Sequence, residues 1–260
     1  MEAQIKKAIK AGNSSAVVLP RSWLNKEVRV ELFRKTPEII LSDVINIARK
    51  YVDIKEIIGI YLVGSYARGE EDDSSDIDML VITKNVDKQM INEGIYNLLI
   101  VSSMLLKQKL DNDLFPIGQM LKEAKPILNS DYLDSIEVKV TKKNTKWYLE
   151  TTKDKLKIIK KILDRIKNKK DISDLVAYTL VLRIRTLCII KKLILNEDYS
   201  KREFIKIIKK ISEGTNAYEG YLAVKKSQQE KNRITFDETE RLYKYLEDQL
   251  LEVKKILKNS

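Results

Sequence analysis

The spacing of apolar and polar residues changes twice along the chain and so divides it into three parts. Residues 1–41 predict short strands, because charged and apolar residues alternate over Glu27–Phe33 as in a half-buried strand. Residues 42–140 alternate short apolar runs with helical spacing, whereas residues 141–260 keep helical spacing. We therefore expect an α+β chain with a small N-terminal β segment, a domain with a mixed sheet and a C-terminal helical bundle.

The middle part predicts strands of ordinary length joined by helices. Strands are expected at 56–63, 77–83 and 95–101, with a further candidate at Ile136–Val138. Just before this part, Glu38–Leu41 is a candidate for another strand of the N-terminal segment. Helices are expected at 43–53, 65–69, 102–110 and 119–124. Ser42 and Asp43 are suitable caps for the first of these helices. The segment Thr141–Asn144 is expected to be a hinge that leads into the bundle.

The C-terminal part predicts a bundle of about five helices, since no proline follows Lys146. Residues 172–195 are apolar nearly all round, which is typical of the central helix of a bundle. Arg183 and Arg185 lie in this helix, and a buried guanidinium needs a partner. We expect either an ion pair with an acid such as Asp174 or Glu219, or a contact with a phosphate of the substrate.

Composition excludes several kinds of protein. The charged, amphipathic start of the chain argues against a signal peptide. No stretch of about 20 residues is both apolar and uncharged, so we expect no membrane span. The single cysteine, Cys188, excludes an internal disulfide and suits a reducing compartment, so a cytoplasmic location is expected. The absence of histidine excludes histidine-based catalysis and histidine metal ligands.

Charge is spread unevenly over the chain, whose net charge is +11. Residues 43–140 carry a net charge of −6, and residues 141–260 carry +13. A basic surface of this kind can bind nucleic acid or another polyanion. It can equally reflect a lysine-rich background, because lysine is abundant in every part of the chain.

The richest chemistry lies around two apolar runs in the middle part. Ile57–Val63 ends at Gly64-Ser65, and ten residues separate Ser65 from Asp76. Asp76 and Asp78 then lead into the second run and are expected on one face of a strand, since side chains alternate along it. Two neighbouring carboxylates repel each other unless a cation lies between them, and Mg²⁺ is commonly held by carboxylates together with substrate phosphates. The plainer alternative is a pair of solvated aspartates at the end of a strand.

This combination resembles the nucleotidyltransferases of the polymerase-β superfamily, and above all their small prokaryotic and archaeal members. Those read Gly-Ser-x-Ala-Arg-Gly and then Ser-Asp-apolar-Asp. The matching residues are Gly64, Ser65, Ala67, Arg68, Gly69, Ser75, Asp76 and Asp78. The resemblance implies Mg²⁺ on Asp76 and Asp78, and a nucleoside triphosphate, with ATP expected, on Gly64, Ser65, Arg68 and Ser75. For Arg68 a salt bridge to the acidic loop that follows it is an equal alternative.

The sequence departs from the family pattern at one position. The family carries a third carboxylate, a metal ligand or base, on its third strand, and the aligned residue is Asn97. An asparagine accepts no proton and binds a cation more weakly than a carboxylate. Glu137 and Glu93 are possible substitutes, the first within an apolar-Glu-apolar pattern and the second just before the third strand.

Two functions follow from the resemblance. The first is Mg²⁺-dependent transfer of a nucleoside monophosphate to a hydroxyl group on a protein, an RNA or a small molecule. The second is a dimeric regulator that keeps the fold and binds nucleotide or DNA but has lost turnover at Asn97.

The N-terminal segment adds a second resemblance. Gly12-Asn13-Ser14 followed by Val17–Trp23 is similar to the AbrB-like swapped-hairpin regulators, whose chains interlock as dimers and often bind DNA. The resemblance implies a homodimer, and DNA contacts through Lys6, Lys7, Lys10 and Arg21. The alternative is a β appendage that packs on the catalytic domain.

Overall fold

The computed structural model describes residues 4, 6, 8–31, 36–72, 75–165, 171–229 and 234–259. Its contacts divide the chain into two compact units, each made of discontinuous segments. The first unit comprises Met1–Lys107 and Glu123–Glu137, and the second comprises Gln108–Lys122 and Val138–Ser260. The chain thus enters the second unit, returns to the first and leaves it again. The predicted division at residues 41 and 140 stays a prediction.

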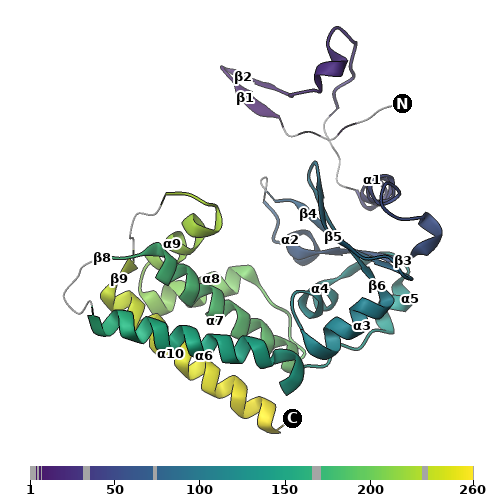
Figure 1. Ribbon diagram of the computed structural model, residues 1–260. Coiled ribbons are helices and arrows are strands. Elements are labelled where there is room, and N and C mark those ends of the chain that lie inside the picture. Colours follow the sequence, from purple (N-terminus) through teal and green to yellow (C-terminus); the bar gives the residue numbers. More distant parts are fainter. Residues whose placement is uncertain are drawn as a thin grey trace. The chain divides into compact units, whose positions relative to one another are not determined.

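The first unit is built on a five-stranded mixed sheet in the order β5-β6-β4-β3-β7 (Figure 1). Its strands are β3 (Ile57–Val63), β4 (Ile77–Thr83), β5 (Lys88–Glu93), β6 (Tyr96–Ser102) and β7 (Lys125–Leu128). Strands β4 and β6 run parallel, and all other neighbours run antiparallel. The three strands predicted from apolar runs are confirmed as β3, β4 and β6. The fold class is likewise confirmed.

Helix α1 (Pro37–Ala48) packs on one face of this sheet. Its buried residues Val44 and Ile47 belong to one apolar cluster with Ile77 and Met79, which are alternate residues of β4. Leu80 and Ile82, whose side chains point to the opposite face of β4, are also fully buried, so β4 is covered on both faces. This explains why the strand reads as a continuous apolar run rather than as an alternating one.

The start of α1 corrects two expectations. Thr36 caps the helix by accepting a hydrogen bond from the N–H of Ile39 at 3.5 Å, and Pro37 is its first residue. Proline is favoured there, because the N–H that it lacks would have no partner within the helix. The strand expected at Glu38–Leu41 and the cap expected at Ser42 and Asp43 are therefore wrong, since both lie inside α1.

The N-terminal segment contains one hairpin, formed by β1 (Ile9–Ala11) and β2 (Ser14–Ala16). The strand expected over Glu27–Phe33 is not formed over its described residues, and residues 32–35 lie outside the described part. Val28 and Val30, which would line its apolar face, are 44% and 71% exposed. Among the described strands none pairs with this segment, and alternation alone does not hold a strand. The AbrB-like arrangement is not confirmed.

Both edge strands of the sheet, β5 and β7, were absent from the prediction. Strand β7 contains Pro126, which has no N–H to donate and is tolerated in edge strands. The strand expected at Ile136–Val138 is wrong, because this segment follows α5 (Ser130–Asp134) without regular structure.

The second unit is a helical bundle, as predicted. Its five long helices are α6 (Lys142–Arg165), α7 (Asp174–Ile194), α8 (Lys201–Ser212), α9 (Asn216–Lys225) and α10 (Phe236–Asn259). Helix α7 packs against α6, α9 and α10 and so forms the centre. Short strands β8 (Asp171–Ile172) and β9 (Ile234–Thr235) pair just before α7 and α10. No helix in the described residues is long and apolar enough to cross a membrane.

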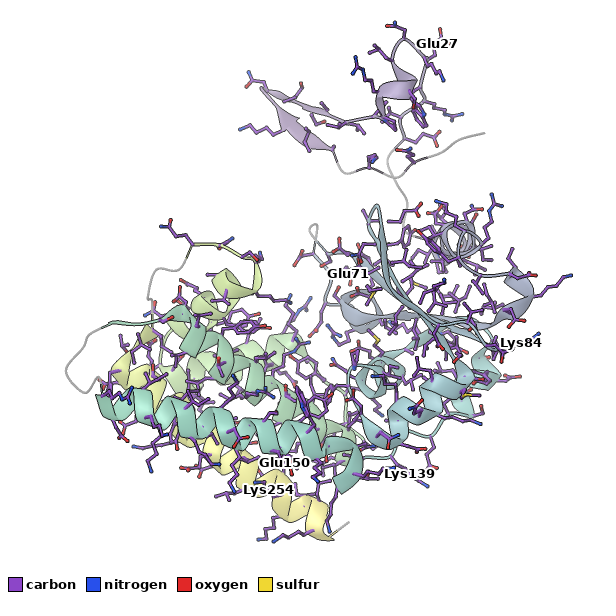
Figure 2. All side chains as sticks on the ribbon, in the orientation of Figure 1. Glu27, Glu71, Lys84, Lys139, Glu150 and Lys254 are labelled. Atoms are coloured by element: carbon purple, nitrogen blue, oxygen red, sulfur yellow. The ribbon has the colours of Figure 1, made fainter. Side chains whose placement is uncertain are left out.

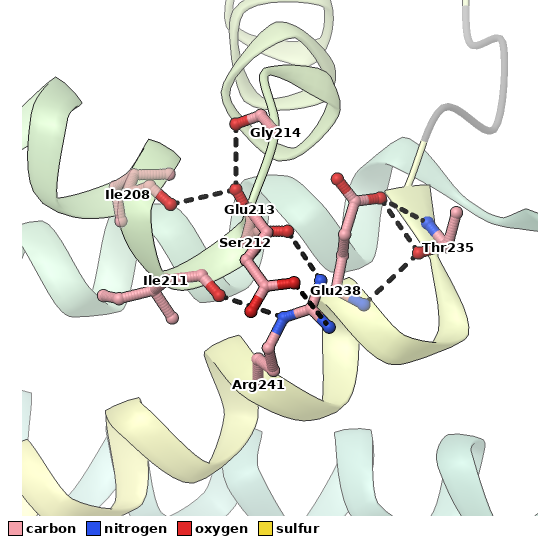
Figure 3. A network of polar contacts seen from close by, with 8 residues as sticks. All are labelled: Ile208, Ile211, Ser212, Glu213, Gly214, Thr235, Glu238 and Arg241. Atoms are coloured by element: carbon pink, nitrogen blue, oxygen red, sulfur yellow. Dashed lines mark hydrogen bonds and ion pairs between the residues drawn. The ribbon is translucent and has the colours of Figure 1, made fainter.

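Helix α10 begins with a reciprocal capping box (Figure 3). The N–H of Thr235 donates to Glu238 Oε2 at 2.9 Å, and the N–H of Glu238 donates to Thr235 Oγ1 at 3.2 Å. One turn later, Arg241 donates to the carbonyls of Ile211 at 3.1 Å and Ser212 at 2.7 Å. These carbonyls end α8 and have no partner inside it. The network therefore joins the start of α10 to the end of α8.

The segment Thr141–Asn144 is not a loose hinge. Asn144 is 2% exposed and lies in the first turn of α6. Its amide nitrogen donates to the carbonyls of Leu110 at 2.7 Å and Lys139 at 2.8 Å, and its oxygen accepts from the N–H of Thr141 at 2.8 Å. Helix α6 is thereby fixed to the end of α3 (Ser103–Asn112) within the second unit.

The two arginines of α7 do not form the first of the two contacts considered for them. Arg183 donates to Thr151 Oγ1 at 2.9 Å and lies over the ring of Trp147, 5.7 Å from its centre. Arg185 lies over the ring of Tyr199 at 5.6 Å. In the described part of the chain these contacts are with a hydroxyl group and rings, and no ion pair of either arginine with Asp174 or Glu219 is formed. The alternative, a contact with a phosphate of the substrate, stays a prediction.

Candidate functional site

The candidate site lies where β3 ends. Val63, the last residue of β3, pairs with Asp78 near the start of β4, because these strands run antiparallel. Helix α2 (Gly64–Arg68) follows at once and ends at Gly69, whose φ of +65° is in the left-handed region. The Gly-Ser turn of the sequence motif is therefore beside the Asp-apolar-Asp motif, although ten residues separate the two.

Only glycine fits at position 64. Its φ is +72°, a backbone angle that residues other than glycine rarely adopt. A Cβ atom there would lie 2.3 Å from Oδ2 of Asp78, far inside van der Waals contact. Asp78 thus packs directly against the backbone of the turn, so that turn and carboxylate form one site.

The two aspartates flank Ile77, which is fully buried. Asp76 precedes β4 and is exposed, whereas Asp78 is half-buried within β4. Oδ1 of Asp78 accepts a hydrogen bond from Nδ2 of Asn97 at 3.1 Å, and the same two residues are register partners in the parallel pair β4 and β6. The expectation that the two carboxylates share a cation stays a prediction.

An amide, that of Asn97, fills the place that a third carboxylate would take on β6. Glu93 forms an ion pair with Lys50 at 2.5 Å, and Glu137 is exposed after α5. Across the described residues no group of three acidic, cysteine or histidine side chains could hold a metal ion. Two carboxylates together with phosphate oxygens are nevertheless a usual ligand set for Mg²⁺, so Asp76 and Asp78 fit this ion.

Arg68 is held between two carboxylates. Its Nε donates to Oε2 of Glu70 at 2.9 Å, and its Nη1 donates to Oε2 of Glu123 at 2.5 Å. Burial alone would lower the pKa of Arg68, but the charges of Glu123 and Glu70 outweigh it, and the pKa is raised. Of the two roles considered for Arg68, the structure contains the salt bridge to the acidic loop.

Glu123 is the site residue that sequence reasoning missed. It ends α4 (Ile117–Glu123), and its Oε1 accepts a hydrogen bond from the backbone N–H of Gly64 at 2.8 Å. No local pattern announces this contact, because the two residues are 59 positions apart.

The loop between α2 and β4 is closed by Ser75. Its hydroxyl oxygen accepts from the N–H of Asp72 at 2.9 Å, and its own N–H donates to the carbonyl of Asp72 at 2.8 Å. The carbonyl of Ser65 accepts from the N–H of Glu70 at 2.9 Å. Glu71 is an exposed member of this loop (Figure 2). The loop thus returns the chain from α2 to Asp76.

Residues 41–187, more than half of the chain, match the model of the nucleotidyltransferase domain. One similar solved structure is a nucleotidyltransferase-like protein from Exiguobacterium sibiricum, 16% identical, with 82% of this chain and 75% of that chain covered and a TM-score of 0.39. Another is the spectinomycin adenyltransferase AAD(9) from Enterococcus faecialis with ATP and spectinomycin, 14% identical, with coverages of 81% and 99% and a TM-score of 0.38. No protein of curated function matches the chain.

Proposed function

Because the chain belongs to the nucleotidyltransferase domain family and is thus a nucleotidyltransferase, we propose that it uses Mg²⁺ to transfer a nucleoside monophosphate to a hydroxyl acceptor. The donor is a nucleoside triphosphate, with ATP as the first to test. The observation that carries the proposal is the contact of Gly64 with Asp78, where an added Cβ would lie 2.3 Å from a carboxylate oxygen. A phosphate-binding turn and a metal-binding carboxylate must be this close to act on one triphosphate.

Each motif residue has a role in this proposal. Asp76 and Asp78 would hold the metal ion. Gly64 and Ser65 would bind phosphate oxygens through backbone N–H groups and a hydroxyl, and the guanidinium of Arg68 would bind a phosphate as well. Bound Mg²⁺ would neutralise charge on the triphosphate and on the leaving pyrophosphate. The hydroxyl of Ser75 would donate a hydrogen bond to a phosphate oxygen, since its oxygen already accepts one from the N–H of Asp72.

The reaction itself exchanges one phosphorus–oxygen bond for another. The acceptor oxygen bonds to the α-phosphorus, the bond from that phosphorus to the bridging oxygen of the β-phosphate breaks, and pyrophosphate leaves. The hydroxyl proton passes to solvent. Such transfers depend mainly on positioning and charge neutralisation, so that a site with an amide at Asn97 can still support them.

The test is transfer of an α-phosphate label. The protein is incubated with each of the four labelled nucleoside triphosphates and Mg²⁺, with and without cell extract, and compared with Asp76→Asn/Asp78→Asn. Asp111→Asn/Asp134→Asn is the matched control, because it removes two exposed carboxylates outside the site. We expect transfer by the wild type and the control alone. Transfer that survives Asp76→Asn/Asp78→Asn contradicts the proposal.

A second candidate function is a regulator without turnover, and the amide of Asn97 on Asp78 favours it. In that case the triphosphate binds but no label is transferred. The N-terminal segment would then supply a dimer interface and a DNA contact. The exposed apolar side chains of Ile9, Val18 and Val30 support the dimer interface. Sedimentation of the full chain and of a variant that begins at Thr36 tests the dimer, which should be lost with residues 1–35.

A further inference from the structure

A single carboxylate, that of Glu123, holds two of the groups to which the sequence motif assigns the triphosphate. It accepts from the N–H of Gly64 at 2.8 Å and from the guanidinium of Arg68 at 2.5 Å. These donors bind phosphate oxygens as readily as carboxylate oxygens. If the proposed function holds, Glu123 therefore lies where a phosphate group of the nucleotide would bind.

The contact is not that of two solvated surface chains. The side chains of Arg68 and Glu123 are 13% and 11% exposed. Exposed ion pairs contribute little, whereas a desolvated pair is costly to separate unless new partners arrive. A ligand that enters this place must therefore offer oxygens to both donors.

Arg68 keeps a partner when Glu123 leaves. Glu70, which is 7% exposed, accepts from its Nε at 2.9 Å. One guanidinium thus faces two carboxylates, and Glu70 alone balances its charge. Glu123 is the last residue of α4, so its side chain can rotate away without breaking a hydrogen bond inside the helix.

We propose that Glu123 is a specificity-determining residue, an internal anion that a polyphosphate displaces and a monophosphate does not. The inference rests on the proposed function, because it takes Gly64 and Arg68 as phosphate ligands. Displacement breaks the hydrogen bonds of Glu123 with Gly64 and Arg68. A triphosphate offers several charged oxygens in return, whereas a single phosphate group compensates less of the loss. The site would thereby select nucleotides by the length of their phosphate chain.

Calorimetry of inorganic polyphosphates in metal-free buffer tests the proposal without requiring turnover. Phosphate, pyrophosphate and tripolyphosphate are titrated into the wild type, Glu123→Gln and Glu70→Gln. We expect Glu123→Gln to bind tripolyphosphate about tenfold more tightly, as loss of one charged hydrogen-bond partner implies, and to discriminate less against phosphate. Glu70→Gln is the matched control, since it removes a negative charge that contacts Arg68 but leaves the carboxylate that contacts Gly64 in place. Its affinity should be unchanged or lower.

The outcomes separate the inference from the proposed function. Equal gains in both variants mean simple charge repulsion and overturn the inference, and weaker binding by Glu123→Gln makes Glu123 a support of the site and also overturns it. In either case the proposed function stands, because tripolyphosphate still binds. No binding by any of the three proteins overturns the inference together with the phosphate role of Gly64.

A second measurement needs no variant to fold. The chain has eight glycines, so selective ¹⁵N-glycine labelling gives few signals. We expect the Gly64 amide signal of the wild type to move on addition of tripolyphosphate, as one acceptor replaces another, while that of Gly12 stays. A Gly64 signal that stays in place when calorimetry shows saturation would overturn the inference.

Discussion

Nδ2 of Asn97 donates a hydrogen bond to Oδ1 of Asp78 at 3.1 Å, across the parallel strands β6 and β4. The amide spares Asp78 the repulsion that a third carboxylate would exert there. It also leaves the site with a weaker cation ligand, so that stability without metal and affinity for metal are opposed at this position.

Asn97→Asp should reverse this balance. We expect the variant to be about 1 kcal/mol less stable than the wild type without metal, because like charges then face each other. Mg²⁺ should raise its melting temperature more than that of the wild type, and label transfer should rise. Asn92→Asp is the control, since it adds a carboxylate on the neighbouring strand, opposite Asn97. An equal response of both variants to Mg²⁺ would contradict the expectation.

Gly64→Ala should weaken binding of the triphosphate at least tenfold. The added Cβ would lie 2.3 Å from Asp78 Oδ2, so the turn or the carboxylate must move. Gly69→Ala separates this clash from backbone strain, because Gly69 has a φ of +65° but nothing within 4 Å of its added Cβ. We expect Gly69→Ala to cost about 1 kcal/mol of stability and to retain binding. Calorimetry and urea unfolding measure the two effects, and equal loss of binding in both variants would rule out the clash.

Arg68→Met should lower the free energy of unfolding by about 3 kcal/mol, since it removes the positive charge that compensates the mostly buried carboxylates of Glu70 and Glu123. Arg29→Met is the matched control. Arg29 pairs with Glu31, but the two side chains are 87% and 65% exposed, so the loss should be below about 1 kcal/mol. Urea unfolding of both variants checks the difference, and similar losses would mean that burial of the Arg68 cluster adds nothing.

Asn144→Ala should lower the free energy of unfolding by about 3 kcal/mol, because it removes the three hydrogen bonds that the buried side chain of Asn144 makes with Leu110, Lys139 and Thr141. Asn85→Ala serves for comparison, since Asn85 is exposed and makes one long contact, 3.5 Å, with Glu56. Its substitution should change stability by less than about 0.5 kcal/mol. A loss at Asn144 as small as that at Asn85 would show that its three hydrogen bonds do not hold α6.

Tyr61 should make stability depend on pH in the alkaline range. Its hydroxyl donates to the carbonyl of Asn129 at 3.0 Å, and burial raises its pKa to about 12. Because the folded-state pKa is raised, the stabilisation is fully present below pH 10 and is lost as the pH rises through about 12. Tyr61→Phe should cost about 1 kcal/mol at neutral pH and should then lose less stability than the wild type over this range.

The control for this prediction is Tyr51→Phe, at a side chain that is 41% exposed. It should keep the wild-type decline. Unfolding by urea at a series of alkaline pH values measures all three proteins, and parallel curves for the wild type and Tyr61→Phe would contradict the assignment.

The central strands were predictable because burial on both faces makes them apolar throughout, as in Ile77–Thr83. The edge strands were not, since Lys88–Glu93 and Lys125–Leu128 are polar or interrupted by proline and are held by their neighbours rather than by their own pattern. Alternation misled at Glu27–Phe33, where none of the strands in the described residues pairs with this segment.

The motif residues of the site were identifiable because their types and spacing are local in sequence. Their mutual placement depends on the pairing of Val63 with Asp78. The sequence predicts this pairing only if the two apolar runs are assumed to be adjacent strands. Glu123 was out of reach, because its role depends on a fold that brings it back to Gly64 from 59 positions away.

The interleaved course of the chain has a consequence for its synthesis. Strand β3 is made early, yet its second neighbour, β7, leaves the ribosome only after Gln108–Lys122, a segment that belongs to the other unit. That segment in turn is held by α6, which is synthesised later and whose Asn144 donates to the carbonyl of Leu110. During translation neither unit can therefore complete its fold before part of the other has been synthesised. A chain arrested between residues 107 and 137 exposes apolar surface of both units.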